Sequence, residues 1–551
     1  MNVRHSLLGA ACSAILVLAP ALGAQATAPV GALSTYQPGV DVLDYDVHLE
    51  LPDTGAFLRG DVTVTARRAA SVTRLWLDLS DSMTVRSVEL NGRRVSVEHR
   101  GNRLDVPLAS ADGDSVRVRV VYDGIVRDGL VVRKDALGRW TWFGDNWPDR
   151  ARLWLPTVDH PSEKATVTWA VRAPVGRTVV ANGALLGTQP LTGRDAGRVE
   201  TRWRESRPIP TDIMVIGAGP LVRYDLREPD CHYGDQGQCV RQSVYVMPEI
   251  RSWLPGPFSA AGPILSLFEG LVGPFPYEKL AHVQSETRFG GMENASAIFY
   301  DGKAFSKHTL KDGTIAHEIA HQWFGDAVTE REWAHLWLSE GFATYFAALW
   351  EQYIRGDTAF RRTMSKMRGE ILTDSVVAKR PVIDTAQTDY LSLLNANSYQ
   401  KGGYVLYMLH REVGDSAFFR ALKSYYATYR HGTALSDDLR REMEKTSGRS
   451  LAQFFNQWLR RPGFAEPSIG WAFDEAAGRV SLFVLQDGLR GAYELPLTVV
   501  VTDADNVERR VLVTVPAEAR ATVPLPGQFA RKPRSLAFDP DSLLLARISR
   551  L

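Results

Sequence analysis

Two histidines and two glutamates near the middle of the chain have the types and spacing of a catalytic zinc site. His317, Glu318 and His321 lie in one His-Glu-Ile-Ala-His run, and eighteen residues separate His321 from Glu340. Residues four apart on a helix share a face, so both histidines can bind one metal ion. A catalytic zinc takes three protein ligands and keeps one position open. We therefore expect His317, His321 and Glu340 to hold one Zn²⁺, and Glu318 to act as general base on a metal-bound water.

Two helices must position these side chains. Apolar spacing predicts a helix over 315–324, ended by Gly325, and a second over 335–355, ended by Gly356. Glu340 then lies in the first turns of the second helix. Inward-facing histidines and a carboxylate would leave unpaired buried charge without a metal, so a purely structural role is the weaker interpretation.

Length and composition limit the classes of protein that need consideration. A chain of 551 residues is too long for one ordinary core, which predicts several domains. Hydrophobic content of 45% and charged content of 23% are typical of a soluble globular protein. The formal net charge of +1 favours neither a nucleic-acid partner nor an electrostatic membrane anchor.

The first residues have the pattern of a secretory signal peptide. Arg4 and His5 precede an apolar run over 7–22, and small residues follow, with cleavage expected after Ala24 or Ala26. The alternative is a retained anchor, but about 16 apolar residues are short for a membrane span. We expect a signal peptide over 1–24 and an exported protein, periplasmic or secreted, without stable membrane insertion after cleavage.

Two cysteines would remain after cleavage, Cys231 and Cys239. In an exported protein this pair predicts a small loop-closing disulfide. His232 beside Cys231 leaves a second metal site as the weaker alternative.

The pattern of apolar residues changes twice along the chain. Period-2 alternation, typical of strands, covers 45–51, 61–66, 115–122 and 165–171. Helical patterns dominate from 254 and cover 401–412, 417–429, 437–446 and 451–459, up to the Arg461-Pro462-Gly463 break. Alternation returns over 479–485, 495–502 and 510–515. We expect a multidomain α+β protein with an all-β domain over 25–207, a catalytic domain over 208–465 and a β-sandwich over 466–551.

A second motif, Phe289-Gly290-Gly291-Met292-Glu293-Asn294, lies before the zinc helix. Paired glycines leave the backbone open to an extended ligand, as an edge strand does, and Glu293 could hold an ammonium group. Taken alone, this motif is more typical of a turn with a solvated glutamate.

Together these motifs resemble the gluzincin aminopeptidase family, which includes aminopeptidase N and leukotriene hydrolase. The matching residues are Gly290 to Asn294, His317 to His321, Glu340, Tyr399 in Tyr-Gln-Lys-Gly-Gly, the run 151–161 and the run 454–459. The resemblance implies a saddle-like N-terminal β domain, a thermolysin-like α/β catalytic domain and a C-terminal β-sandwich. The signal pattern and the expected sandwich over 466–551 then indicate an exported short form, without the large C-terminal helical domain of the longest members.

The resemblance implies a role for each matching residue. The enzyme would be a zinc aminopeptidase acting on peptides with a free N-terminus, with Glu318 as base and Tyr399 as donor to the oxyanion. Glu293 would pair with the substrate's α-ammonium group, and Gly290, Gly291 and Met292 would bind the substrate.

Three departures from the family pattern affect these expectations. Gly291 stands where alanine is more common, and Ser339 stands where asparagine often precedes the zinc glutamate. A second amine anchor, usually Gln or Glu, is replaced by the run 144–148, in which Asp145 or Asn146 could substitute.

Other functions stay open at this stage. A thermolysin-type endopeptidase shares the zinc geometry but does not need Glu293. A non-catalytic zinc-binding receptor would be expected to lose Glu318 or Tyr399, and both are present. No feature demands epoxide hydrolysis. The dense aromatic residues over 140–154 could form a sugar platform, but packing is the stronger interpretation because tryptophans are mostly buried.

Overall fold

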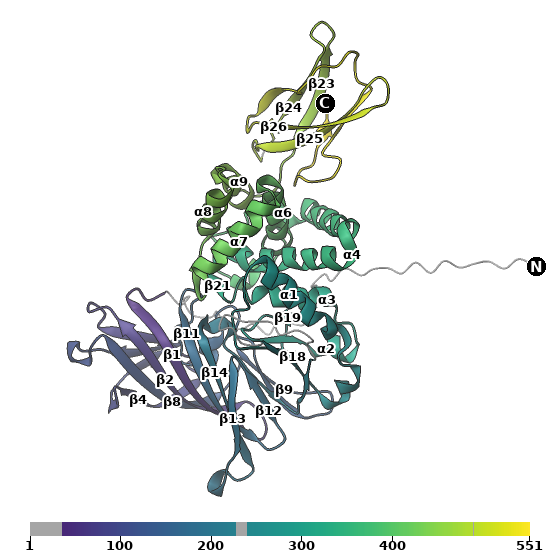
Figure 1. Ribbon diagram of the computed structural model, residues 1–551. Coiled ribbons are helices and arrows are strands. Elements are labelled where there is room, and N and C mark those ends of the chain that lie inside the picture. Colours follow the sequence, from purple (N-terminus) through teal and green to yellow (C-terminus); the bar gives the residue numbers. More distant parts are fainter. Residues whose placement is uncertain (1–35, 227–239, 489) are drawn as a thin grey trace, which may run out of the picture. The chain divides into compact units, whose positions relative to one another are not determined.

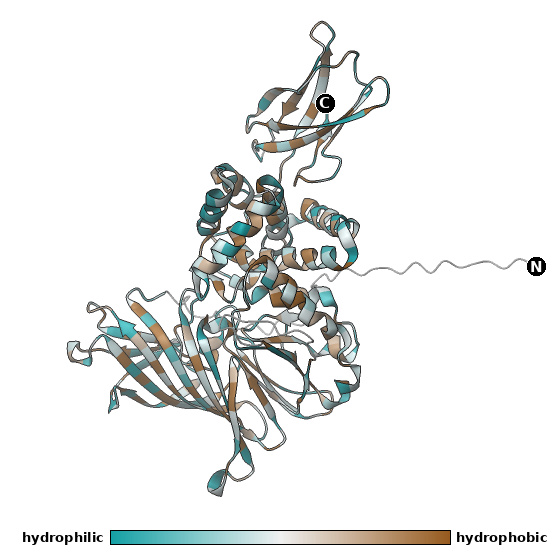
Figure 2. Ribbon diagram, viewed as in Figure 1, coloured by the Kyte–Doolittle hydropathy of each residue, from teal (hydrophilic) through white to brown (hydrophobic). Residues whose placement is uncertain are grey.

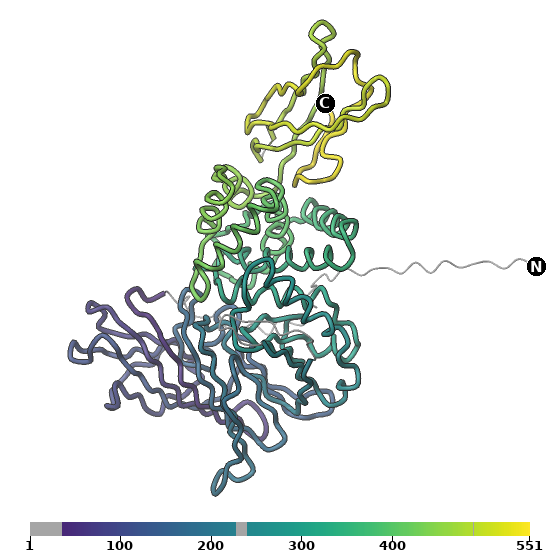
Figure 3. Tube along the Cα trace, in the orientation of Figure 1, coloured from purple at the N-terminus to yellow at the C-terminus, as the bar shows by residue number. Residues whose placement is uncertain are grey.

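The computed structural model describes residues 36–226, 240–488 and 490–551. The predicted signal peptide and the Cys231–Cys239 pair lie outside the described residues. Among the described helices, none is both long and apolar enough to cross a membrane. Figure 3 traces the chain from purple N-terminal strands through teal and green helices to yellow C-terminal strands.

The N-terminal part consists of β-sheets, as the alternating sequence predicts. Strand β1 alternates buried and more exposed residues along most of its length, so one face of its sheet supplies a hydrophobic core. Figure 2 shows this alternation as brown and teal bands along the N-terminal strands. The largest sheet runs β13 (Ala184–Pro190), β14 (Arg198–Pro210), β11 (Lys164–Pro174), β1 (Val40–Glu50), β2 (Phe57–Arg68), β8 (Ser115–Ile125), β4 (Met83–Leu90) and β5 (Arg93–Arg94).

Two smaller sheets complete this part. One of them carries the segment 140–144, which leads into the run that resembles the family's 151–161 segment. Their strands are β12 (Thr178–Ala181), β15 (Ile216–Gly219), β10 (Trp140–Gly144) and β9 (Leu130–Lys134) in one sheet, and β3 (Arg74–Asp78), β7 (Arg103–Pro107) and β6 (Glu98–Arg100) in the other.

The middle part begins with a five-stranded sheet that the alternation pattern did not reveal. Its three central strands are largely buried and mix polar with apolar residues, so no period-2 alternation marks them in the sequence. The order is β16 (Val222–Asp225), β17 (Arg241–Val246), β18 (Lys279–Ser285), β20 (Ala297–Asp301) and β19 (Gly291–Met292). The glycine motif therefore lies on an edge strand, as expected, and among the described residues β19 pairs, antiparallel, only with β20.

Helices accompany this sheet: one lies between β17 and β18 in the chain, and the others follow β20 (Figure 1). They are α1 (Ala261–Leu271), α2 (Gly302–Ser306), α3 (Asp312–His321), α4 (Trp337–Thr373), α5 (Ser375–Lys379), α6 (Gly402–Val413), α7 (Asp415–Tyr429), α8 (Ser436–Ser447) and α9 (Ala452–Leu459). A parallel pair, β21 (Val328–Glu330) and β22 (Gly432–Ala434), joins the segment after α3 to the segment between α7 and α8.

The two predicted helices of the zinc motif are present with changed ends. Helix α3 stops at His321, and Gly325 takes a φ of 114°. Helix α4 continues to Thr373, but Gly356 has a φ of 77° and interrupts its helical geometry. The predicted stop at Gly356 is thus a kink between two helical stretches, because a glycine adopts positive φ at low cost.

The C-terminal strands form two sheets whose inward residues share a core, as in a β-sandwich. The predicted strands over 479–485, 495–502 and 510–515 are confirmed. The sheets run β27 (Arg520–Pro524), β24 (Arg479–Leu485), β23 (Ser468–Asp474), β29 (Ser549–Arg550), and β26 (Glu508–Val515), β25 (Leu495–Thr502), β28 (Ser535–Phe538). The predicted fold class, multidomain α+β with β-rich ends, is confirmed.

Candidate active site

The three predicted metal ligands converge. Helix α3 places His317 and His321 on one face, and the first turn of α4 brings Glu340 to them. The two Nε2 atoms lie 3.1 Å apart, and Glu340 Oε2 lies 3.3 Å from His317 Nε2 and 3.4 Å from His321 Nε2. Ligands at about 2.0–2.2 Å from a tetrahedral zinc lie roughly 3.3–3.6 Å from one another. The three atoms therefore fit a single zinc ion at their centre.

Aromatic packing holds the two helices at this distance. Phe324, after α3, stacks on Phe342 of α4 with ring centroids 4.1 Å apart and planes 9° apart. Phe346, one turn further along α4, packs on Phe324 and on Phe268 of α1. All four rings are buried, so the ligands project from a rigid apolar support.

The buried carboxylates and histidines of the site also favour binding of a cation. Glu340 Oε2 is buried and has no hydrogen-bond partner among the described residues. Burial raises the pKa of Glu340, but the neighbouring His321 and His317 outweigh it and hold that pKa at about 2. Burial lowers the pKa of His321, yet Glu293 and Glu340 raise it well above its ordinary value. An ionised ligand with an unused oxygen, among further carboxylates, has the chemistry of a zinc site.

Neighbouring residues orient the ligands. His321 Nδ1 lies 2.9 Å from Ser339 Oγ and 3.2 Å from the carbonyl oxygen of Phe324, so both can hold its ring. A Cβ at Gly325 would lie 2.3 Å from Ser339 Oγ, which explains a glycine there. The serine that departs from the family pattern therefore still contacts a zinc ligand.

Glu318 lies beside the edge strand. It is 6% exposed, and a Cβ built at Gly291 of β19 would fall 1.9 Å from its Oε1 atom. Burial, the largest cause, and the nearby Glu293 and Glu340 raise the pKa of Glu318 well above its ordinary value, although His321 opposes them. A buried carboxylate with a raised pKa is a stronger base, as proton transfer near neutral pH requires.

Glu293, the residue directly after β19, reaches the same site. One carboxylate oxygen each from Glu293 and Glu318 and one ring nitrogen of His321 lie within 4.8 Å of one another. Burial raises the pKa of Glu293; His321 opposes this and Glu340 adds to it. Two carboxylates so close to a two-histidine site offer a place for a further positive charge, such as an ammonium group.

Gln322, which the sequence motifs did not single out, fixes Glu293 to the zinc helix. Its Nε2 donates to the carbonyl oxygen of Glu293 at 2.7 Å and to Asp326 Oδ2 at 2.8 Å. Its Oε1 accepts from the backbone N–H of Ser296 at 2.8 Å, and the side chain is fully buried. Because Gln322 directly follows His321, the metal ligands and Glu293 share one support.

Tyr399 also reaches the site. It lies in a single π-helical turn, Asn397–Lys401, and its hydroxyl donates to Glu340 Oε1 at 2.7 Å. Its ring lies parallel to that of His317, 13° apart, with centroids separated by 6.1 Å. Burial and the adjacent Glu340 raise the pKa of Tyr399 well above its ordinary value, so the phenol stays protonated and can donate. Its predicted role toward an oxyanion stays a prediction.

Gly290 presents open backbone, as expected, whereas Glu318 fills the space beside Gly291. Gly290 is exposed, a Cβ there would meet nothing within 4 Å, and its carbonyl oxygen accepts from the Asp301 N–H. Met292 is buried in the core, so its side chain supports the strand rather than facing an open cleft.

The suggestion that Asp145 or Asn146 could substitute for the second amine anchor finds no support in the structure. Both are fully buried. Asp145 accepts from Arg150 and Arg288, and Asn146 bonds the carbonyls of Thr211 and Met214 and the indole N–H of Trp154. Every polar atom of these two side chains has a partner within the protein, which leaves none for a substrate amine.

The neighbouring aromatic residues are mostly buried, so packing, not a sugar platform, is their role: Trp142, Phe143, Trp147, Trp154.

Comparison with known proteins relates these features to a family. Residues 42–213 match the Peptidase M1 N-terminal domain and residues 260–458 match the Peptidase family M1 domain. The chain is 24% identical over 457 residues to "Probable aminopeptidase 2" of Sulfurisphaera tokodaii, covering 78% of this chain and 56% of that protein. The chain thus spans about half the length of the curated relatives it matches.

Solved structures share the fold. A mutant M1 zinc metallopeptidase from Deinococcus radiodurans, bound to a Tyr-Ser-Ala substrate, is 28% identical with a TM-score of 0.66, covering 77% of this chain and 94% of that one. Aminopeptidase A of Legionella pneumophila, in complex with aspartic acid, is 16% identical with a TM-score of 0.79, covering 94% of this chain and 60% of that one. The second similarity extends the fold comparison to nearly the whole chain.

Proposed function

The chain belongs to peptidase family M1, and from this premise we propose that it is a zinc-dependent aminopeptidase that removes the N-terminal residue of peptides with a free α-amine. One observation carries the proposal beyond metal-dependent hydrolysis: the carboxylate of Glu293 lies within 4.8 Å of Glu318 and His321. A carboxylate fixed beside the reacting centre can pair with the charged α-amine of a peptide, which places the first peptide bond at that centre.

His317, His321 and Glu340 would hold the zinc. When bound, zinc supplies a water that ionises near neutral pH and a Lewis acid that polarises the scissile carbonyl. Glu318 takes the proton of the attacking water on its carboxylate and delivers it to the leaving nitrogen, a contribution of about 10²–10⁴-fold. The hydroxyl of Tyr399 can turn from Glu340 Oε1 toward the carbonyl oxygen of the substrate as charge develops there.

Glu293 would determine where the peptide is cut. Its carboxylate pairs with the substrate's α-ammonium group, and a blocked amine leaves that carboxylate buried and unpaired. The backbone of Gly290 and Gly291 lies at the edge of the sheet, where it would align the substrate as an added strand beside β19. The two features together favour exopeptidase over endopeptidase activity.

The other candidate functions receive less support. A thermolysin-type endopeptidase has no use for Glu293 at this position. A non-catalytic zinc-binding receptor has no use for a buried Glu318 beside the metal ligands or for Tyr399 next to them.

We further propose that the protein is exported. The basic residues, the apolar run over 7–22 and the small residues after it support a secretory signal, with the mature chain in the periplasm or the medium. Fractionation of the native host and N-terminal sequencing of the mature protein test this. A mature chain that begins after Ala24 or Ala26 supports export, and a full-length cytoplasmic chain contradicts it.

The experiment for the main proposal is a panel of aminoacyl p-nitroanilides, each free and N-acetylated, with and without a zinc chelator. The free substrates should be cleaved, the acetylated ones should not, and chelation should abolish activity reversibly. Cleavage of acetylated peptides at internal bonds would support the endopeptidase instead, and zinc binding without turnover would support the receptor.

A further inference from the structure

Arg288 connects the substrate-aligning segment to two aspartates of the N-terminal β domain. It directly precedes Phe289 and the glycines. Its Nε donates to Asp145 Oδ2 at 2.8 Å and its Nη2 to Asp128 Oδ1 at 2.5 Å. These bonds span 143 and 160 residues of sequence, so they join parts of the chain that local structure does not bring together.

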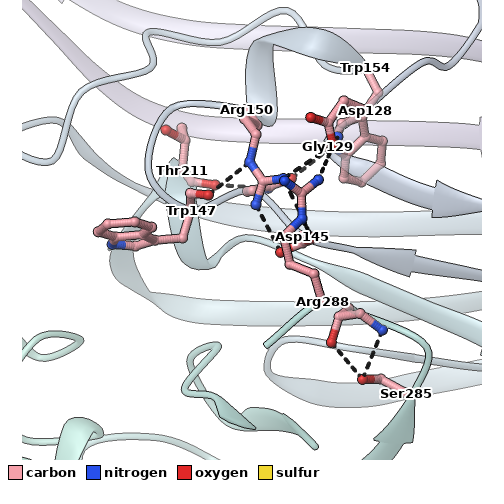
Figure 4. Close-up of polar contacts among 11 residues, drawn as sticks. Asp128, Gly129, Asp145, Trp147, Arg150, Trp154, Thr211, Ser285 and Arg288 are labelled. Carbon is pink, nitrogen blue, oxygen red and sulfur yellow. Dashed lines mark hydrogen bonds and ion pairs between the residues drawn. The ribbon is translucent and has the colours of Figure 1, made fainter. Parts of the chain in front are cut away.

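Arg150 completes a four-residue cluster, which we call the Asp145 cluster: Asp128, Asp145, Arg150 and Arg288. Arg150 donates to Asp145 Oδ1 at 2.9 Å and to Asp128 Oδ1 at 3.1 Å. Figure 4 shows the two guanidinium groups converging on the two aspartates. The Asp145 side chain is 0% exposed and that of Arg150 is 8% exposed. Two positive and two negative charges balance, and each carboxylate bridges both arginines.

A second, aromatic contact joins the same two segments. The Trp147 ring packs edge-on against Phe289, with centroids 6.4 Å apart, and against Trp333, which precedes α4, at 5.4 Å. The carbonyl oxygen of Trp147 accepts from Arg150 Nε at 2.8 Å. Arg150 therefore holds both the ionic and the aromatic contact to residues 288–289.

The segment is fixed at its start as well. Ser285, the last residue of β18, bonds the hydroxyl of Thr287 at 2.8 Å and the carbonyl oxygen of Tyr300 at 3.1 Å. Between this anchor and the Gly290–Asp301 backbone bond, two side chains tie the segment to the β domain by charge. Glu286 Oε2 lies 3.9 Å from Arg133 Nε of β9, and Arg288, nearer the glycines, makes the shorter contacts to Asp128 and Asp145.

We propose that the Asp145 cluster positions the 289–293 segment, so that recognition of the substrate amine by Glu293 depends on carboxylates of the N-terminal β domain. Buried ion pairs add little net stability, because desolvation offsets their attraction, but they fix geometry. Arg288 is a positioning residue, since it acts on the substrate only through Phe289, the glycines and Glu293. The kinetic part of the test, which measures KM and kcat, rests on the proposed aminopeptidase function.

The test compares Arg288→Gln and Asp145→Asn with Asp159→Asn as matched control. Asp159 forms a buried ion pair with Arg152 at 3.1 Å, with side chains 1% and 4% exposed, and within the described part of the chain it forms no hydrogen bond or ion pair with residues 288–293. Both cluster variants should raise KM for a free leucyl p-nitroanilide roughly tenfold or more, since small displacements of a binding group are costly, with kcat changed much less. The control should lower stability and leave KM unchanged.

Two further measurements separate positioning from stability. Arg288→Lys keeps the charge, but an ammonium group cannot reproduce the two guanidinium hydrogen bonds to Asp145 and Asp128. Its KM should therefore lie between those of the wild type and Arg288→Gln. Amide hydrogen exchange over 286–294, measured without substrate, should be faster in Arg288→Gln and normal in Asp159→Asn. Arg288 is 42% exposed, so its variants should fold even where Asp145→Asn does not.

The outcomes distinguish this inference from the proposed function. Wild-type protein that does not cleave free-amine substrates overturns the aminopeptidase proposal, and the exchange measurement then decides the positioning role alone. Unchanged KM and unchanged exchange in Arg288→Gln overturn the positioning role, whatever the stability of the variant.

Discussion

The carboxylate of Glu318 lies in the space that a side chain at Gly291 would fill. A Cβ at position 291 would be 1.9 Å from Glu318 Oε1 and 2.3 Å from its Cδ atom. Ordinary contacts between such atoms are about 3.5 Å or longer. The Glu318 carboxylate can therefore occupy its position only because residue 291 of the edge strand has no side chain.

Gly291→Ala should lower kcat because the methyl group displaces the Glu318 carboxylate. We expect a loss of roughly 10- to 100-fold in kcat, the order that a displacement of about 1 Å brings, with zinc content unchanged. Gly290→Ala is the control, since a Cβ there meets nothing within 4 Å. Full activity in Gly291→Ala would show that Glu318 has a second, equally productive position. Because alanine is more common at this position in the family, the variant also tests whether this chain depends on the glycine.

Glu318→Gln should lose turnover and keep the metal. The amide preserves the shape of the side chain but cannot accept the proton, so kcat should fall about 10²–10⁴-fold. The metal ligands His317, His321 and Glu340 are untouched, and metal analysis should still give one zinc per chain. Normal turnover in this variant would overturn the role of Glu318 as base.

Glu293→Ala should lose recognition of the free amine. The carboxylate that pairs with the α-ammonium group is gone, so KM for free aminoacyl substrates should rise, by roughly 10- to 100-fold for a charge-assisted contact of about 1.5–3 kcal/mol. The ratio of kcat/KM for free over N-acetylated substrates should fall with it. If that ratio does not change, another group recognises the amine.

The zinc ligands could be predicted from the sequence, whereas their supports could not. His317 and His321 share a face by helix geometry alone, and Glu340 follows on the next helix. The sequence also predicts the edge position of Gly291, because paired glycines suit a strand whose backbone is open to a ligand. Gln322, Arg288 and Asp145 carry no such pattern, since the contacts that make them supports reach residues 26 to 160 positions away and only the folded chain defines them.

Ser339→Ala should weaken zinc binding without removing it. Ser339 Oγ lies 2.9 Å from Nδ1 of the ligand His321, and removing such a partner typically costs about 10- to 100-fold in metal affinity. The Phe324 carbonyl oxygen, 3.2 Å from the same nitrogen, remains and should keep the loss near the lower figure. Competition titration with a chromophoric chelator measures the effect; equal zinc affinity would assign the orientation of His321 to Phe324 alone.

His282 should make the fold sensitive to acid. It lies in the core of the catalytic part, on β18, with Nδ1 3.0 Å from the hydroxyl of Tyr300 and Nε2 3.1 Å from Gln242 Oε1. Burial and the nearby Lys279 lower the pKa of His282 to about 3. Its ordinary value is about 6.5, so the unfolded chain binds a proton between these pH values and the folded chain does not.

The free energy of unfolding should therefore fall as pH falls through 6.5 toward 3. The contribution of His282 amounts to about 2 kcal/mol between pH 7 and pH 5, because the unfolded state gains the proton over that interval. His282→Asn should be less stable at pH 7, where it loses packing and a hydrogen bond, but its stability should decline less between pH 7 and pH 5. Urea unfolding followed by tryptophan fluorescence at both pH values measures the difference. Equal declines in the two proteins would mean that His282 is already protonated in the folded state, or shielded in the unfolded one.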